Sequence, residues 1–153
     1  MKRSEIKSIG LNCKLVKFLI CEMILIESNK LTWISPFITD FPVSPPKNHY
    51  SKSKNFIDFL FENVNSKNIK LEVYTTSRGA KTLLERNNVV RTDLVKIYQN
   101  DKIHEKALIT SYFFYKGSAN FTYMGMNSNL ESCEIGLVRE NSDFSPFDFW
   151  GSP

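Results

Sequence analysis

The sequence has few of the residues that mark a disulfide-stapled or zinc-binding protein. Its 153 residues include only three cysteines and two histidines. Cys13, Cys21 and Cys133 form neither an evenly spaced framework nor a CxxC pair, so the sequence predicts no disulfide scaffold and no zinc site. Cys13 and Cys21 fit one helix as core residues. A reducing cytoplasm is the compartment that suits this cysteine usage.

A long apolar run is also missing. The basic first three residues are followed by an apolar stretch, as in a signal peptide, but Lys14, Lys17 and Glu22 interrupt it and no small-residue cleavage site follows. The stretch is too short and too charged to span a bilayer. We therefore expect a cytoplasmic protein with no membrane segment and with an amphipathic first helix.

The composition is that of a globular protein, with 42% hydrophobic and 24% charged residues, and twelve Phe and six Tyr predict an aromatic interior. The net charge of +4 suits a polyanionic partner. The length predicts a single domain over residues 1–153, with a core over about 11–138. Residues 139–153 then form a C-terminal extension, whose four aromatic residues are expected to pack onto the domain or across a dimer.

Hydrophobic periodicity predicts an α/β protein with a mixed β-sheet flanked by helices. Helices are expected over 11–28, 54–65, 79–88 and, briefly, 121–125. Strands are expected over 31–38, 71–76, 94–98, 105–110, 112–116 and 133–138. The segment 39–53 carries three prolines and reads as a loop, which is either a binding or lid element or a plain surface excursion.

One segment carries residues suited to phosphodiester chemistry. His104 and Lys106 stand at i and i+2 at the start of a predicted strand, so their side chains should project together. A neutral imidazole can attack phosphorus while an ammonium group stabilises charge on a non-bridging oxygen. An HxK triplet alone occurs by chance, and a lone histidine is more often structural than catalytic.

Further along the chain, Gly117-Ser118-Ala119-Asn120 offers small residues that let backbone approach a phosphate, and two neutral side-chain donors. Glu131 follows, and a carboxylate there can orient an imidazole through its Nδ1–H. Each piece has an ordinary structural explanation by itself: a GSxN turn is common, and a single glutamate usually lies on the surface.

The ordered combination resembles the phospholipase D superfamily, whose signature is HxK, then Asp, then GSxN. Here His104-x-Lys106 and Gly117-Ser118-x-Asn120 match, and Glu131 matches the downstream acidic position. The segment 33–37 more loosely resembles the family's first core strand. The resemblance implies a catalytic set of His104, Lys106, Ser118, Asn120 and Glu131. Thr110 stands where the family has Asp, a supporting residue, so a degenerate, binding-only chain stays an alternative.

Family chemistry uses two such motifs that face one another, and this chain has one. His49 has no lysine at i+2 and no GSxN after it. The resemblance therefore implies a homodimer with the active site at its interface, a phosphohistidine intermediate, and no metal or other cofactor. A heteromeric partner that supplies the second motif is the less economical alternative.

Single-motif members similar to this chain are mostly nucleases, so the resemblance and the positive charge favour nucleic acid, most simply DNA, as substrate. Small nucleases of this kind occur in bacterial restriction and anti-phage systems with a helicase or ATPase partner. A phosphodiesterase for lipid or a small substrate is the other enzymatic alternative. Lysines near the loop and beyond it are either phosphate contacts or plain solvated residues, namely Lys47, Lys52, Lys54, Lys67 and Lys70. Strand packing explains at least two of the aromatic residues 112–115 better than base stacking does.

Overall fold

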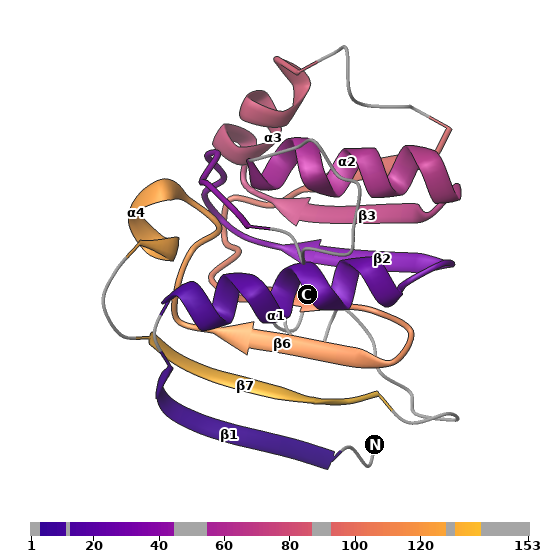
Figure 1. Cartoon of the computed structure of the whole chain (residues 1–153). Helices are drawn as coiled ribbons and strands as arrows, with labels where there is room; N and C mark the ends of the chain where they lie inside the picture. The colour runs from indigo at the N-terminus through magenta and orange to yellow at the C-terminus, as the bar shows by residue number, and fades with distance from the viewer. Residues whose placement is uncertain (1–3, 12, 45–54, 87–92, 128–130, 139–153) are drawn as a thin grey trace.

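The computed structural model describes residues 4–11, 13–44, 55–86, 93–127 and 131–138, shown in colour in Figure 1. For residues 4–11, 13, 131 and 132 it describes the backbone alone. No helix in these ranges is long and apolar enough to cross a membrane.

Seven strands form one mixed sheet in the order β1-β7-β6-β5-β2-β3-β4. The strands are β1 (Ser4–Leu11), β2 (Lys30–Ile34), β3 (Lys70–Thr75), β4 (Val95–Gln99), β5 (Lys106–Ile109), β6 (Phe113–Gly117) and β7 (Glu131–Leu137), and the helices are α1 (Cys13–Ile26), α2 (Phe56–Lys67), α3 (Ser77–Leu84) and α4 (Tyr123–Met126). Strands β2, β3 and β4 run parallel, and all other pairs are antiparallel. The predicted α/β class with a mixed sheet is confirmed.

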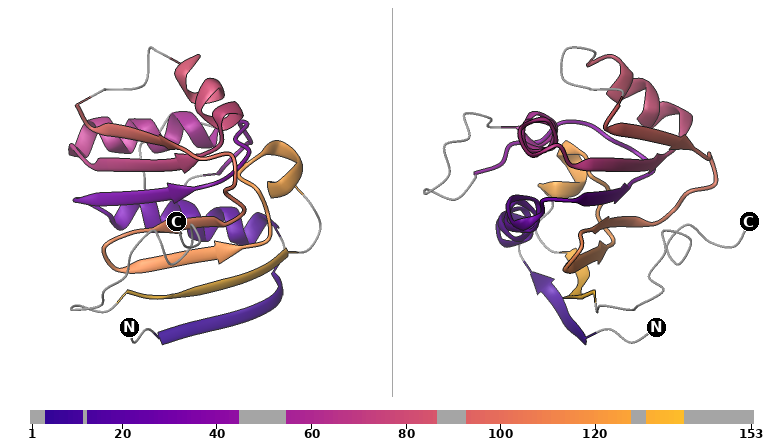
Figure 2. Two further views of the ribbon diagram at one scale, coloured as in Figure 1. Left: turned by 180° about the vertical axis from the view of Figure 1, so that it is seen from behind. Right: turned by 90° about the vertical axis from the view of Figure 1, so that its right-hand side faces the viewer.

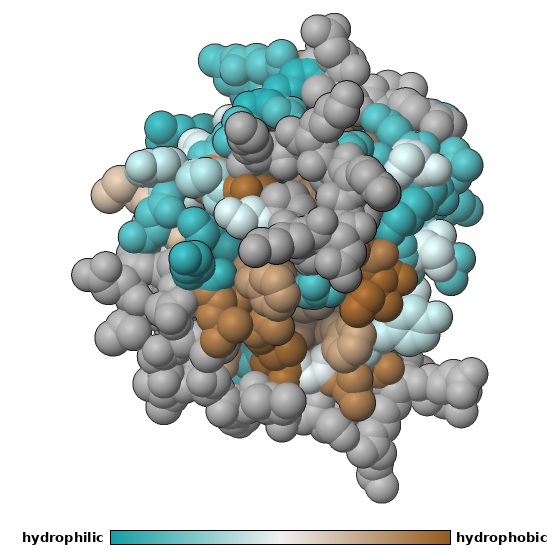
Figure 3. All heavy atoms as spheres, viewed as in Figure 1, coloured by the Kyte–Doolittle hydropathy of each residue, from teal (hydrophilic) through white to brown (hydrophobic). Residues whose placement is uncertain are grey.

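Helices α1 and α2 cover one face of the sheet (Figure 2). Alternate strand residues point to that face, so Trp33, Leu108 and Tyr115, which lie side by side in the register, are all fully buried. The ring of Trp33 meets Phe56 of α2 edge-on, at 5.5 Å between centroids. Apolar side chains also gather on the outer side of α1 (Figure 3), where Phe18 is 44% exposed.

The start of α2 is tied to the segment after β2 by Asp40. One oxygen of its carboxylate accepts from the backbone N–H of Ile57, at 3.1 Å, and the other pairs with Arg86 at 2.6 Å. Arg86 also pairs with Asp58 in the first turn of α2. The carboxylate therefore does the work of an N-cap, since Asn55 makes no side-chain capping bond.

The turn between β5 and β6 is held by two buried polar residues. The hydroxyl oxygen of Thr110 accepts from the backbone N–H groups of Tyr112 and Phe113, at 3.1 and 2.8 Å. The carboxylate of Glu27 accepts from the N–H and hydroxyl of Ser111, at 2.7 and 2.6 Å. This turn therefore docks onto the end of α1.

Most of the predicted elements are present with shifted ends, and β1 is the main one that was missed. Among the strands that the structure describes, β1 pairs with β7 alone, at the border of the sheet. A strand with a single neighbour needs less apolar character, and the sequence Ser-Glu-Ile-Lys-Ser-Ile-Gly-Leu alternates weakly. The predicted first helix began at residue 11, and the structure begins α1 at Cys13.

Candidate active site

The register of the sheet brings the two halves of the HxK…GSxN pattern to one edge. Lys106, the first residue of β5, pairs with Gly117, the last residue of β6, and Gly117 pairs in turn with Cys133 of β7. Ala107 pairs with Ile34 at the carboxyl end of β2. This edge, on the left in Figure 1, is therefore where the parallel strands end, and we call it the carboxyl edge. The backbone of Glu131, at the start of β7, lies at the same edge.

His104 lies just before β5 rather than on it, in a turn that begins at Asn100. The N–H of Asn100 donates to the carbonyl of Thr75, and the N–H of Ile103 donates to the carbonyl of Asn100. Ile103 is buried at 2% exposure, whereas His104 itself is exposed. The turn is thus anchored on both sides, and the imidazole is open to a substrate.

Asp101 fixes this turn to the start of α3. Its carboxylate accepts from the N–H and the hydroxyl of Ser77, at 2.8 and 2.9 Å. These hydrogen bonds lower the pKa of Asp101 below its ordinary value, and the bond from the Ser77 backbone has the larger effect.

Lys106 and Lys116 point to opposite faces of the β5–β6 hairpin, because Lys106 shares the face of Leu108 and Lys116 sits opposite Ala107. Lys116 pairs with Glu105 at 3.1 Å. No carboxylate within the described residues pairs with Lys106, a half-buried residue whose ammonium group is thus not engaged in an ion pair there. Opposite Lys106 stands Gly117, which has no side chain to fill the space.

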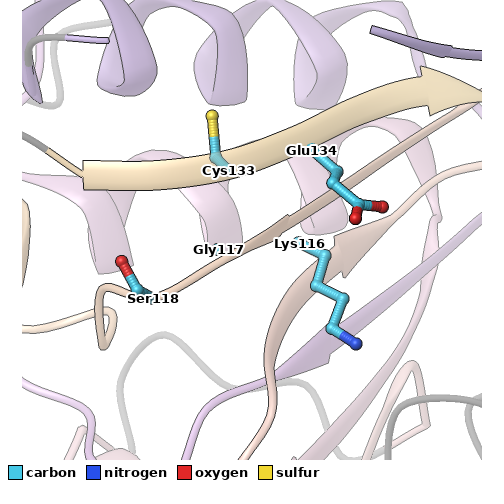
Figure 4. Close-up of a pocket in the computed structure, with 5 residues that line it drawn as sticks. All are labelled: Lys116, Gly117, Ser118, Cys133 and Glu134. Atoms are coloured by element: carbon cyan, nitrogen blue, oxygen red, sulfur yellow. The ribbon is translucent and has the colours of Figure 1, made fainter. Parts of the chain in front are cut away.

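A cavity of about 240 Å³ adjoins the GSxN segment and is lined by Ser118, Gly117 and Cys133 together with Lys116 and Glu134. In Figure 4 the side chains of Lys116 and Glu134 extend to one face of the sheet, and the Cys133 thiol points to the other. Ser118 is exposed and directly follows β6. Its hydroxyl is therefore accessible from the carboxyl edge.

The segment that carries Asn120 is fastened to the chain after β2. The N–H of Phe121 donates to the hydroxyl of Ser35 at 3.1 Å, and the N–H of Thr39 donates to the carbonyl of Phe121 at 3.2 Å. Gly125 packs so closely that a Cβ there would stand 2.3 Å from the carbonyl oxygen of Asn120. Asn120 therefore has a backbone position that is fixed from two sides.

The side-chain oxygen of Asn120 is buried and accepts no hydrogen bond from the part of the chain that the structure describes. Such orphaned polar atoms are few in native proteins and call for an explanation. This oxygen needs a donor, which an N–H or O–H group of a second protein chain or a protonated neighbouring catalytic group can supply.

Thr110, which stands where the signature of the phospholipase D superfamily has Asp, lies at the opposite edge of the sheet from Lys106. It is 5% exposed and holds the hairpin turn. The signature has four residues between its lysine and its Asp, whereas three residues separate Lys106 from Thr110. A count from Lys106 therefore places the Asp position at Ser111. Thr110 and Ser111 both stabilise the turn between β5 and β6. The difference from the signature therefore lies in the hairpin turn and not at the carboxyl edge.

Two of the lysines considered as phosphate contacts, Lys67 and Lys70, also lie at the edge of the sheet opposite the carboxyl edge, which we call the far edge. The ammonium group of Lys67 donates to the carbonyls of Leu25 and Glu27, at 2.6 and 3.3 Å. Burial lowers the pKa of Lys67, although the charge of Glu27 opposes the shift. The interpretation of Lys67 as a free phosphate contact is wrong, and Lys70 begins β3 at this same far edge.

Of the four aromatic residues 112–115, Phe114 and Tyr115 are fully buried, as strand packing predicts, and Tyr112 is 51% exposed. Within the described ranges no three His, Cys, Asp or Glu side chains come together in a group that could hold a metal ion. The Glu131 side chain, His49, the lysines of the 45–54 loop and the 139–153 extension lie outside the described residues.

Sequence reasoning did not single out the residues that form a second hollow beside Asn120. They include Phe37 after β2, Arg78 at the start of α3 and Tyr123 of α4. Their positions in the sequence could have indicated them, because each closely follows either a strand that ends at the carboxyl edge or the GSxN segment. Side chains at the carboxyl ends of parallel strands commonly form ligand sites.

Comparison with solved structures identifies the fold. The chain is similar to Nuc, a phospholipase D family member from Salmonella typhimurium, with a TM-score of 0.57, 13% identity, and coverage of 87% of this chain and 83% of Nuc. It is also similar to NucT from Helicobacter pylori (TM-score 0.59, 11% identity, 88% and 86% coverage). A third similar structure is phosphatidylserine synthase from Haemophilus influenzae, of which the match covers 35% (TM-score 0.58, 12% identity, 88% of this chain).

The chain therefore has the fold of the phospholipase D superfamily, which agrees with the resemblance predicted from its motif. No protein-family model matches the sequence, and no curated protein matches it significantly.

Proposed function

We propose that this chain is a phosphodiesterase that cuts DNA without a metal ion, as a homodimer, through a phosphohistidine intermediate on His104. The observation that carries the proposal is the convergence of Lys106, Ser118 and Asn120 on one edge of a phospholipase D fold, beside an exposed His104. The backbone of Glu131 begins the next strand at that edge.

In the first step the neutral imidazole of His104 attacks phosphorus, an N–P bond forms, and the P–O bond to the leaving group breaks. A second imidazole gives its proton to the leaving oxygen. Lys106, Ser118 and Asn120 stabilise the non-bridging oxygens as negative charge develops on them. In the second step that imidazole takes a proton from water, which attacks phosphorus and releases His104.

We assign the second imidazole to a second copy of this chain. The sequence holds one HxK and one GSxN, and its other histidine, His49, belongs to neither. A two-fold dimer with the carboxyl edges facing one another supplies a second His104 and a second Lys106 without a different partner protein. Glu131 is assigned to orient the imidazole, as the resemblance implies.

DNA is the favoured substrate because the chain carries a net charge of +4 and the open imidazole and ammonium suit a polyanion. A restriction or anti-phage role with a helicase or ATPase partner is compatible with the proposal. The lipid alternative draws support from the similarity to phosphatidylserine synthase. Turnover of phosphatidylcholine vesicles by protein that leaves plasmid DNA intact selects that alternative.

The shared site is tested with dimers that contain one wild-type chain and one His104→Ala chain, purified through two different tags. We expect a solution mass of twice the 17.7 kDa of one chain. The mixed dimer should lose nearly all activity on single-stranded and plasmid DNA, because each turnover needs both imidazoles. A mixed dimer with half of the wild-type rate, or an active monomer, contradicts the shared site.

A further inference from the structure

The hollow beside Asn120 is a cleft of about 450 Å³, within the range of roughly 300–1,000 Å³ that is usual for small-molecule sites. Its lining includes Phe37, Thr39, Arg78, Asn120, Tyr123 and Met124, and we call it the Asn120 cleft. Asn120 belongs both to this cleft and to the GSxN segment. A ligand in the cleft is therefore next to the place where the scissile phosphate is proposed to bind.

The cleft presents aromatic rings and a cation to solvent. Phe37 is 46% exposed and Tyr123 is 56% exposed, and Met124 beside them is 79% exposed. The guanidinium carbon of Arg78 lies 5.9 Å from the centre of the Phe37 ring. Arg78 forms no ion pair with any carboxylate that the structure describes. Exposed rings beside an uncompensated arginine are the groups that bind single-stranded nucleic acid.

The walls of the cleft are joined by hydrogen bonds, so the cleft exists before a ligand arrives. The N–H of Tyr123 donates to the hydroxyl of Thr39 at 2.9 Å, which links the wall that follows β2 to α4. The hydroxyl of Thr76 donates to the carbonyl of Pro36 at 2.6 Å, which links that wall to the start of α3 and so to Arg78. A preformed cleft saves the entropy of ordering its side chains on binding.

We propose that the Asn120 cleft binds an unstacked base of single-stranded nucleic acid, next to the phosphate that is cut. Phe37 and Tyr123 supply the stacking surfaces, and Arg78 contacts a flanking phosphate. This inference rests on the proposed function and narrows its substrate class. A base in duplex DNA is stacked between its neighbours and does not reach the cleft without the cost of unstacking, so the protein prefers single strands.

Binding is measured in EDTA with His104→Ala protein and a fluorescein-labelled oligothymidine, by anisotropy. Phe37→Ala and Tyr123→Ala should each weaken binding by roughly 5- to 150-fold, the effect of losing one base–aromatic stack. Tyr123→Phe keeps the ring and should bind as well as the parent. Tyr112→Ala is the matched control, because Tyr112 is 51% exposed but lies in the hairpin turn at the far edge.

A second substrate separates this inference from the proposed function. Methyl p-nitrophenyl phosphate needs the active site, and wild type and the control Tyr112→Ala, both with His104 intact, should hydrolyse it at the same rate. If the ester is hydrolysed normally and Phe37→Ala and Tyr123→Ala bind oligothymidine as tightly as Tyr112→Ala does, the base-binding role of the cleft is refuted. The proposed phosphodiesterase activity is not affected by that result. If the ester is not hydrolysed but oligothymidine binding still depends on the two rings, the phosphodiesterase activity is refuted and the base-binding role of the cleft is not. Equal affinity for duplex DNA, or ring-dependent binding of phosphatidylserine vesicles in place of oligothymidine, also overturns the cleft.

Discussion

Replacement by alanine of Glu27, the residue that follows α1, should destabilise the fold more than replacement of Glu22 within α1. The side chain is 1% exposed, and its two oxygens accept four hydrogen bonds. Two come from the N–H groups of Asn29 and Lys30, at 2.9 and 3.0 Å, and two come from Ser111. These bonds hold the turn between α1 and β2 against the turn between β5 and β6.

The size of the effect follows from the groups left without a partner. A hydrogen bond to a charged group contributes about 1.5–3 kcal/mol, and such bonds within one cluster are not additive. We expect Glu27→Ala to lower the free energy of unfolding by about 3–5 kcal/mol. Glu27→Gln keeps an acceptor oxygen but points an NH₂ at donors, and should cost about 1–3 kcal/mol.

The pH dependence gives an independent check. Burial alone would raise the pKa of Glu27, but the hydrogen bonds from Ser111, Lys30 and Asn29 outweigh it and hold the pKa below its ordinary 4.5. A lowered folded pKa stabilises the protein above the unfolded pKa, and this stability is lost as pH falls through the folded value. The advantage of wild type over Glu27→Gln should be constant near neutrality and shrink below about pH 4.5.

The assay is urea unfolding followed by far-UV circular dichroism. Glu22→Gln, at a half-exposed position within α1, is the control and should change stability by less than about 0.5 kcal/mol. A Glu27→Ala protein within 1 kcal/mol of wild type by this measure, or an advantage over Glu27→Gln that grows as pH falls, contradicts this account of the hairpin anchor.

Three further predictions concern the hairpin and the carboxyl edge. Lys106→Ala should lower kcat on single-stranded DNA by about 10²–10³-fold, whereas Lys116→Ala, on the other face, should stay within a few-fold of wild type; equal losses contradict the assignment. Gly125→Ala should lower both activity and stability, the latter by about 1–3 kcal/mol, because its Cβ displaces the backbone of Asn120; an unchanged melting temperature contradicts this. Thr110→Val should lose about 1–3 kcal/mol in urea unfolding with kcat unchanged, and a kcat loss without destabilisation contradicts a purely structural Thr110.

The fold was predictable where side chains alternate or repeat at helical spacing. The strand around Trp33, the helix that contains Phe56 and the β5–β6 hairpin all carry strong apolar patterns, because they bury that surface. Strand β1 was not predictable from its pattern, since one pairing partner is enough to hold it at the border of the sheet. The anchor formed by Glu27 was also hidden, because its partner Ser111 is 84 residues away along the chain.

The candidate site was predictable as a set of residues but not as an arrangement. The HxK and GSxN motifs name Lys106 and Asn120, and only the register shows that Lys106 pairs with Gly117, where the GSxN segment begins. The roles of His104 and Glu131 stay predictions. The Asn120 cleft needed the structure, because Phe37, Arg78 and Tyr123 come together through turns that no local pattern specifies.

The most direct test of the phosphodiesterase is hydrolysis of single-stranded and plasmid DNA in EDTA by wild type and by His104→Ala. Wild type should cut in the presence of the chelator, and His104→Ala should be slower by at least about a thousandfold while it melts at the same temperature. Hydrolysis that EDTA abolishes and Mg²⁺ restores, or equal rates for the two proteins, contradicts a metal-independent reaction on His104.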